Sequence, residues 1–225
     1  MRTDSNPDGR QTVRSFIEEA RRAQIVGSAI DTIAELGYGQ ASLARIAERA
    51  GISKGVIGYH FAGKDDLMRE VVAEALTRGR EYMEPRIRGA SGGPEVLRAY
   101  IESNLEFMGQ HRNHVIAIAE IARNARRADG EPNVDPAALE GAVKSLSQLL
   151  ASFQKTGEFR RDFDPLVVAT AIRAAIDAVP RRLAHDPGLD LEHFGHELAN
   201  LFDLATRGST SRSKTQRRAT ESVVR

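Results

Sequence analysis

The fold of this chain is decided at residues 42–61, which read SLARIAERAGISKGVIGYHF. Apolar residues in the first half recur at i, i+3, i+4 and i+7, the spacing of one helix face, at Leu43, Ile46, Ala47 and Ala50. Ser42 precedes this stripe as an N-cap, Gly51 follows it where a positive φ ends a helix, and Ser53 is placed as the next N-cap. The pattern predicts two short helices joined by a tight turn. It is typical of a helix-turn-helix, whose second helix lies in the major groove of DNA.

The charge distribution favours a local contact with DNA. The 225 residues carry 32 Lys and Arg against 31 Asp and Glu, a net charge of +1, so the whole surface is not that of a nucleic-acid binder. Between residues 40 and 64, however, basic side chains outnumber the single acidic residue, Glu48. The tail from residue 207 onward is also basic, with Glu221 as its one acidic residue. The local patch coincides with the predicted helix pair.

Composition excludes several other classes. Cysteine is absent, which rules out disulfides, thiolate metal sites and a cysteine nucleophile. The first residues are polar and no apolar run approaches the length of a membrane helix. No phosphate-binding loop and no nucleophile motif is present. We therefore expect a cytoplasmic protein that is not an enzyme, with no cofactor, no metal and no membrane segment.

Helical periodicity continues through the rest of the chain, without strand-like alternation. The expected fold class is all-α, with about nine helices in total: an N-terminal three-helix helix-turn-helix domain and a larger helical domain for ligand binding and dimerisation. Residues 1–14 lack an apolar period and are expected to be a mobile arm. The predicted boundaries place the DNA-binding domain at 15–62, the effector-binding and dimerisation domain at 63–206, and a disordered basic tail at 207–225.

Several motifs together resemble the TetR family of bacterial transcriptional regulators. They are Ile25-Val26-x-x-Ala29, Leu36-Gly37-Tyr38, Ile46-Ala47-x-x-Ala50-Gly51-Ile52-Ser53-x-Gly55 and Tyr59-His60-Phe61-x-x-Lys64-x-x-Leu67. The resemblance implies a repressor that binds an inverted-repeat operator as a dimer and is released by a small, largely apolar effector. It also implies that the last two helices, about 165–184 and 189–206, form the homodimer.

The resemblance also indicates which side chains touch DNA. By motif position, Ser42, Tyr59 and His60 contact phosphates, as does the charge of Lys64. Lys54 and Val56 open the second helix, where side chains reach guanine edges and thymine methyl groups. The complete set of candidate DNA-contacting residues is Ser42, Arg45, Ser53, Lys54, Gly55, Val56, Tyr59, His60 and Lys64.

One position departs from the family pattern. Gly58 stands where an aromatic residue is usual, and glycine costs about 1 kcal/mol of helix propensity relative to alanine. The chain could therefore seat its second helix on DNA differently. This position is also the single sequence feature that supports one alternative, a helical ligand-binding or partner-binding protein that has lost DNA recognition.

The effector site is expected among the central helices, where polar or aromatic groups interrupt apolar faces. The candidate lining residues are Tyr100, Asn104, Phe107, Met108, His111, His114, Ile118, Phe153, Arg173 and Asp177. Ordinary packing is the alternative for each of them. A helical-bundle enzyme is the other alternative class. The pairs His193/His196 and His111/His114 have helical spacing for a metal, but no second carboxylate motif accompanies them.

Overall fold

The computed structural model describes residues 7–124, 136–186 and 188–208 as an all-α protein. Its helices are α1 (Pro7–Leu36), α2 (Leu43–Arg49), α3 (Lys54–His60), α4 (Lys64–Gly89), α5 (Gly93–Gln110), α6 (Arg112–Asn124), α7 (Pro136–Thr156), α8 (Pro165–Asp177), α9 (Val179–His185) and α10 (Leu191–Thr206). If α8 and α9 are counted as one interrupted helix, the described residues contain nine helices. This agrees with the number expected from the sequence. None of these helices is both long enough and apolar enough to cross a membrane.

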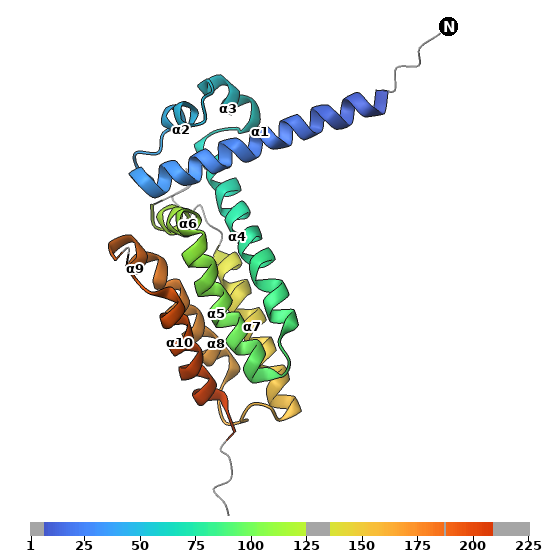
Figure 1. The fold of residues 1–225 in the computed structure, drawn as a ribbon, viewed down its shortest axis with the longest axis vertical. Helices are drawn as coiled ribbons and strands as arrows, with labels where there is room; N and C mark the ends of the chain where they lie inside the picture. Colours follow the sequence, from blue (N-terminus) through green and yellow to red (C-terminus); the bar gives the residue numbers. More distant parts are fainter. Residues whose placement is uncertain (1–6, 125–135, 187, 209–225) are drawn as a thin grey trace, which may run out of the picture.

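The helix α1 begins earlier than its apolar pattern predicts. Residues 7–14, expected to belong to a mobile arm, form its first two turns and extend past the rest of the molecule (Figure 1). Proline is favoured at the start of a helix because its fixed φ is already helical and its missing N–H needs no partner there. The part of the expected arm before Pro7 lies outside the described residues, as does the basic tail beyond residue 208.

The N-terminal unit consists of α1, α2, α3 and the start of α4, and α1 lies across one end of the helical body (Figure 1). Its core buries Ile30 and Ile33 of α1, Ile46 of α2 and Ile57 of α3. The same core continues into other elements: Leu67, Met68 and Val71 of α4, and Ala117 and Ile121 of α6. The expected boundary at residue 62 therefore cuts through a single core. Two seven-residue helices are too short to enclose that core with α1 alone.

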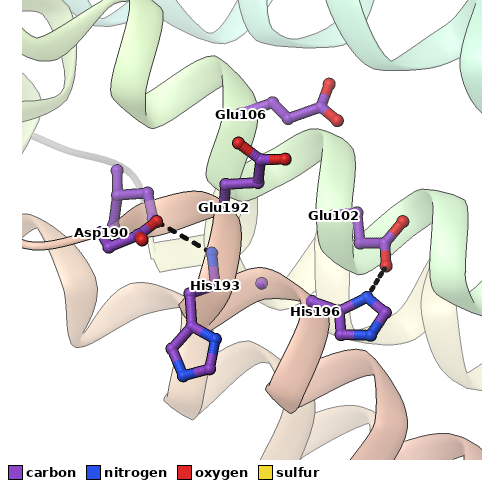
Figure 2. A pocket seen from close by; sticks show the side chains of 8 residues that line it. Glu102, Glu106, Asp190, Glu192, His193 and His196 are labelled. Atoms are coloured by element: carbon purple, nitrogen blue, oxygen red, sulfur yellow. Dashed lines mark hydrogen bonds and ion pairs between the residues drawn. The ribbon is translucent and has the colours of Figure 1, made fainter.

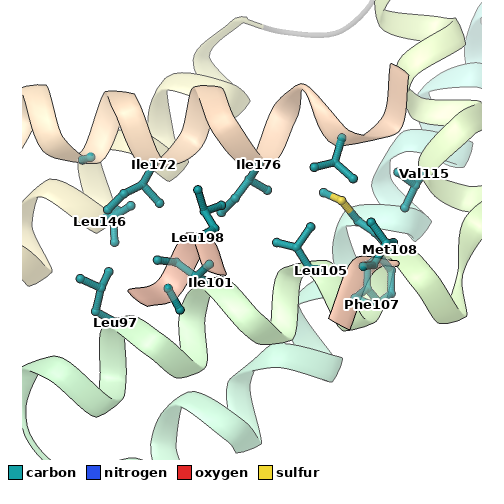
Figure 3. Close-up of a cluster of buried hydrophobic side chains, with 14 of the residues drawn as sticks. Leu97, Ile101, Leu105, Phe107, Met108, Val115, Leu146, Ile172, Ile176 and Leu198 are labelled. Carbon is teal, nitrogen blue, oxygen red and sulfur yellow. The ribbon is translucent and has the colours of Figure 1, made fainter. Parts of the chain in front are cut away.

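The helical body, α4 to α10, has a second hydrophobic core. Figure 3 shows Ile101 and Leu105 of α5, Ile176 of α8 and Leu198 of α10 directed into the same space. The helix α10 packs closely on α5, where a Cβ at Gly195 would lie 3.2 Å from the Cβ of Leu105. The break between α8 and α9 falls at Ala178, two residues before Pro180, as expected from a proline that removes a backbone donor.

Candidate functional site

The α2–α3 turn has the geometry that its sequence predicts. The hydroxyl of Ser42 accepts a hydrogen bond from the Arg45 N–H at 3.3 Å and caps α2. Gly51 adopts a φ of +65°, a conformation that residues with a Cβ rarely adopt. Ser53 stands at the N-cap position of α3, but its side chain makes no capping hydrogen bond. The two helices are thus fixed by local backbone chemistry, and the Ser53 hydroxyl is left exposed.

The helix α3 buries one face and exposes the other. Ile57 is fully buried, whereas Lys54, Gly55 and Gly58 are exposed and Val56 is half-buried. The ring of Tyr59 is 70% exposed and stands edge-on to the half-buried ring of His60, with 5.0 Å between ring centres. A long cation and a phenol are therefore both exposed on a short helix that Ile57 anchors in the core. This is the arrangement that a groove-binding helix needs.

Two residues of α1 that the sequence analysis did not single out hold the helix pair in place. Arg22 donates to the carbonyl oxygen of His60 at 2.7 Å and to the carboxylate of Glu70 at 2.9 Å, and its guanidinium lies 4.4 Å from the centre of the Phe61 ring. Gln24 donates to the carbonyl oxygen of Ala50 at 2.9 Å. The two carbonyl acceptors belong to the last residue of α3 and the C-cap residue of α2. The helix α1 therefore fixes the C-terminal ends of both helices.

Lys64 and Arg45, both predicted to contact DNA, have partners inside the protein. The Lys64 ammonium donates to the carbonyl oxygen of Tyr38 at 2.9 Å and lies over the Tyr38 ring. Burial lowers the pKa of Lys64, while the neighbouring Asp65 opposes that shift. Arg45 donates to the side chain of Gln40 at 2.9 Å and is exposed. Of these three candidate cations, Lys54 is the one that lies on α3, and its side chain is exposed.

The start of α4 carries a further stabilising contact next to this surface. The Asp66 carboxylate accepts a hydrogen bond from the Ala62 N–H at 3.0 Å. This bond is the main reason why the pKa of Asp66 is lowered, and Arg69 contributes to the same shift. The contact satisfies a donor just before the first turn of α4 and fixes the short link after α3.

The structure divides the candidate effector residues into separate groups. The first group is a polar network between α5 and α8. Arg173 donates to the Tyr100 hydroxyl at 3.1 Å and to the Asn104 side-chain oxygen at 3.4 Å, and it pairs with Asp177. Asn104 in turn donates to the carbonyl oxygen of Tyr100 at 2.7 Å. Four residues chosen from the sequence thus lie together in the body.

The second group is aromatic and lies where α4, α5 and α6 meet. The rings of Phe107 and His111 are 4.6 Å apart, and those of His111 and His114 are 5.6 Å apart. Tyr82, which the sequence analysis did not select, joins this group at 5.7 Å from Phe107. Burial lowers the pKa of His114, and the nearby charges of Arg78 and His111 lower it further.

The remaining candidates do not join either group. Met108 is buried in the core of the body, and Ile118 is half-buried on α6. Phe153 packs against Phe159, with 5.5 Å between ring centres, near the start of α5. The candidates therefore lie at separate places in the helical body.

Two hollows border the helical body. One, of about 380 Å³, lies between α5 and α10 and is lined by acidic and histidine side chains (Figure 2). There His196 faces Glu102 at 3.4 Å, and Asp190 caps α10 through the His193 N–H. No group of these side chains, nor any other in the described residues, is arranged to hold a metal ion. The other hollow lies between α7 and α8, and Asp177 is part of its lining.

The comparisons with known proteins match the N-terminal unit most closely. Residues 25–71 match the family model described as bacterial regulatory proteins, tetR family. The HTH-type transcriptional regulator BetI 1 of Chromohalobacter salexigens is 34% identical over 91 residues, which cover 40% of this chain and 45% of that relative. Less than half the length of that relative is therefore matched.

Two further comparisons extend over the helical body. The fatty acid metabolism regulator protein of Bacillus subtilis is 25% identical over 181 residues, covering 80% of this chain and 92% of that relative. The crystal structure of the Bacillus subtilis regulator FadR in complex with stearoyl-CoA has a TM-score of 0.70 at 24% identity, and covers 80% of this chain and 96% of that one. This likeness shows the shared fold of the body.

The exposed helix α3, its anchored partner α2 and the attached helical body define a helix-turn-helix protein. Within that class, residues 25–71 are similar to the TetR family of bacterial regulatory proteins, whose family model they match.

Proposed function

We propose that this protein is a DNA-binding transcription regulator, a repressor that reads its operator with α3. The observation that carries the proposal is the outward face of α3, where Lys54 and Tyr59 project from a helix whose opposite face is buried. Lys54 is suited to donate to a guanine edge, and the Tyr59 hydroxyl to a phosphate. Ser42, Arg45, Ser53, Gly55, Val56, His60 and Lys64 complete the proposed surface. The proposal assigns the chain no enzymatic activity and a place in the cytoplasm.

The proposed active form is a homodimer on an inverted-repeat operator. One α3 makes few base contacts, so two copies are needed for useful specificity. Exposed apolar side chains on α8 and on α10 support this assembly: Val167 is 63% exposed, Leu201 59% and Leu204 74%. Side chains of this size are usually covered when they form a contiguous face. A second copy of the same face would cover them.

The proposed regulatory signal is a small, largely apolar effector bound in the helical body. The similar Bacillus subtilis proteins are a regulator of fatty acid metabolism and the regulator FadR in complex with stearoyl-CoA. An effector that binds better when the two α3 helices are wrongly spaced for DNA must lower DNA affinity by linkage. Release of the operator follows from that coupling.

The test is a selection of binding sites from a random pool of double-stranded DNA, using the full chain. We expect enrichment of an inverted repeat, with an affinity that falls steeply as salt is raised. Failure to enrich any site would instead favour the alternative in which the protein has lost DNA recognition.

A further inference from the structure

Arg173 places a positive charge inside the helical body. Only 15% of its side chain is exposed, and it lies between α5 and α8 beside core residues. Burial alone would lower the pKa of this guanidinium, but Tyr100 and Asp177 beside it outweigh burial and raise the pKa. A buried charge costs free energy unless its partners are well placed, and an apolar residue of similar volume would often be no worse for stability. The position therefore calls for a functional explanation.

The partner of Arg173 lies at the surface of the body. Asp177 stands one turn further along α8, its side chain is 47% exposed, and it lines the open groove of about 770 Å³ between α7 and α8. The Tyr100 hydroxyl and the Asn104 amide surround the guanidinium on its inner side. The Asp177 carboxylate pairs with the other terminal nitrogen of the guanidinium, and it is the one of these three partners that lines the groove.

We propose that the groove between α7 and α8 binds an effector with a carboxylate head and an apolar chain, and that this head takes the place of Asp177 on Arg173. The inference rests on the proposed function, since it names the chemical class of the effector. A carboxylate already satisfies these donors in the present structure, so a second carboxylate can satisfy them equally well. After the exchange Arg173 is again paired with one carboxylate, as it is in the present structure. The net gain then comes from burying the apolar chain against Val143 and Leu166.

The other charged side chains of the groove are compatible with one carboxylate group of a ligand beside Arg173. Lys144 and Glu140 both lie on α7 in the groove lining and offset each other. Asp177 becomes free to turn toward solvent once it is displaced, because its side chain is already half-exposed. An alcohol of the same chain length would lack the charge needed to replace Asp177.

The experiment is calorimetric titration of the full-length protein, without DNA, with hexanoate, octanoate and decanoate and with the corresponding straight-chain alcohols. We expect the carboxylates to bind at least tenfold more tightly than the matched alcohols. Asp177→Asn removes the internal competitor and is expected to tighten octanoate binding about tenfold, roughly the free energy of one charge-assisted hydrogen bond. Arg173→Gln is expected to weaken octanoate binding about tenfold or more while leaving octanol binding unchanged.

The opposite signs of the two variants separate binding from folding. If the pair between Arg173 and Asp177 were only structural, Asp177→Asn would lower the melting temperature and would not tighten octanoate binding, and that result would overturn the proposal. Equal binding of acids and alcohols by the unmodified protein, or no binding of either, would also overturn it. Asp177→Asn keeps the test decisive if Arg173→Gln does not fold. Site selection from random DNA without any ligand tests the proposed function separately, so either proposal can fail alone.

Discussion

The ammonium of Lys64 lies 2.9 Å from the carbonyl oxygen of Tyr38 and 4.1 Å from the centre of the Tyr38 ring. This relationship joins the first turn of α4 to the link between α1 and α2. It gives Lys64 a partner inside the protein at the position where the family resemblance implies a phosphate contact. The two roles lead to different measurable consequences.

We expect Lys64→Met to lower the stability of the N-terminal unit by about 1 kcal/mol, because it removes a hydrogen bond and a cation–π contact from a partly buried site. If Lys64 acts only inside the protein, DNA affinity should fall with stability while the dependence of affinity on salt stays the same. A phosphate contact would behave differently, reducing the salt slope by about one. Salt titrations of operator binding by Lys64→Met, with Lys54→Met as the exposed comparison, distinguish the two roles.

Lys54→Ala should change sequence preference more than it changes the fold. The side chain is exposed at the first residue of α3, so its loss leaves the core intact. A lost base contact costs about 1–3 kcal/mol and relaxes specificity at one position in each half-site. Repeated site selection with the variant measures this change. Tyr59→Phe is the matched control, since loss of a phosphate contact should weaken all selected sites equally. Unaltered preference in the Lys54 variant would remove that residue from the base-reading set.

Leu204→Glu should break the homodimer. Leu204 is 74% exposed on α10, so the charge is tolerated in a single copy but is buried against the partner in the proposed interface. We expect a monomer in sedimentation velocity and operator affinity lower by about a hundredfold, because the two DNA-binding units no longer act together. The control is Leu76→Glu on α4, a different helix, where the leucine is 44% exposed. A Leu204 variant that stayed dimeric would argue for another interface.

The pH dependence of stability should carry a contribution from His114. Its pKa in the folded protein lies below the ordinary value of 6.5, so the unfolded chain takes up the proton first as the pH falls. The contribution of His114 to stability is therefore fully present above pH 6.5. It is lost as the pH falls from 6.5 toward the lower pKa of His114 in the folded protein. Chemical unfolding at pH 7.5 and pH 5.5 should show a smaller loss for His114→Gln than for the unmodified protein. Equal losses in the two proteins would mean that other groups carry the acid sensitivity.

Gly58→Ala should stabilise α3. A Cβ at this position meets nothing within 4 Å, so no contact in the protein requires glycine, and alanine is favoured in helices by about 1 kcal/mol. We expect a higher melting temperature and operator affinity within about twofold of the original, well under the tenfold that 1.4 kcal/mol represents. A large loss of affinity in a more stable protein would show that the backbone at residue 58 lies directly against DNA.

Local chemistry explains what could be predicted from the sequence. The Ser42 cap, the positive φ of Gly51 and the break before Pro180 each depend on one residue type and its immediate neighbours. The contact of Arg22 with His60 joins residues 38 positions apart, and no helical period indicates it. Polar partners across such separations follow from packing, which the apolar pattern does not specify.

The candidate effector residues also show that the apolar pattern does not specify which side chains meet. Four polar residues that interrupt apolar helix faces do lie together, in a network that spans two helices. They are Tyr100, Asn104, Arg173 and Asp177. The same criterion also selected Phe153, which packs at the far end of the body, because interruption of a face does not say what the side chain meets. Tyr82 does not meet this criterion, because its neighbours Glu81 and Glu84 are charged and no apolar face is interrupted there.

The helix α6 contributes Ala117 and Ile121 to the core of the N-terminal unit and Val115 to the core of the body. Its Glu120 also accepts a hydrogen bond from the Tyr38 N–H at 3.3 Å. A chimaera that exchanges residues 1–62 for those of another regulator would keep an α6 shaped for the original partner. Redirecting this protein to a new operator therefore requires grafting the inner face of α6 together with the DNA-binding helices.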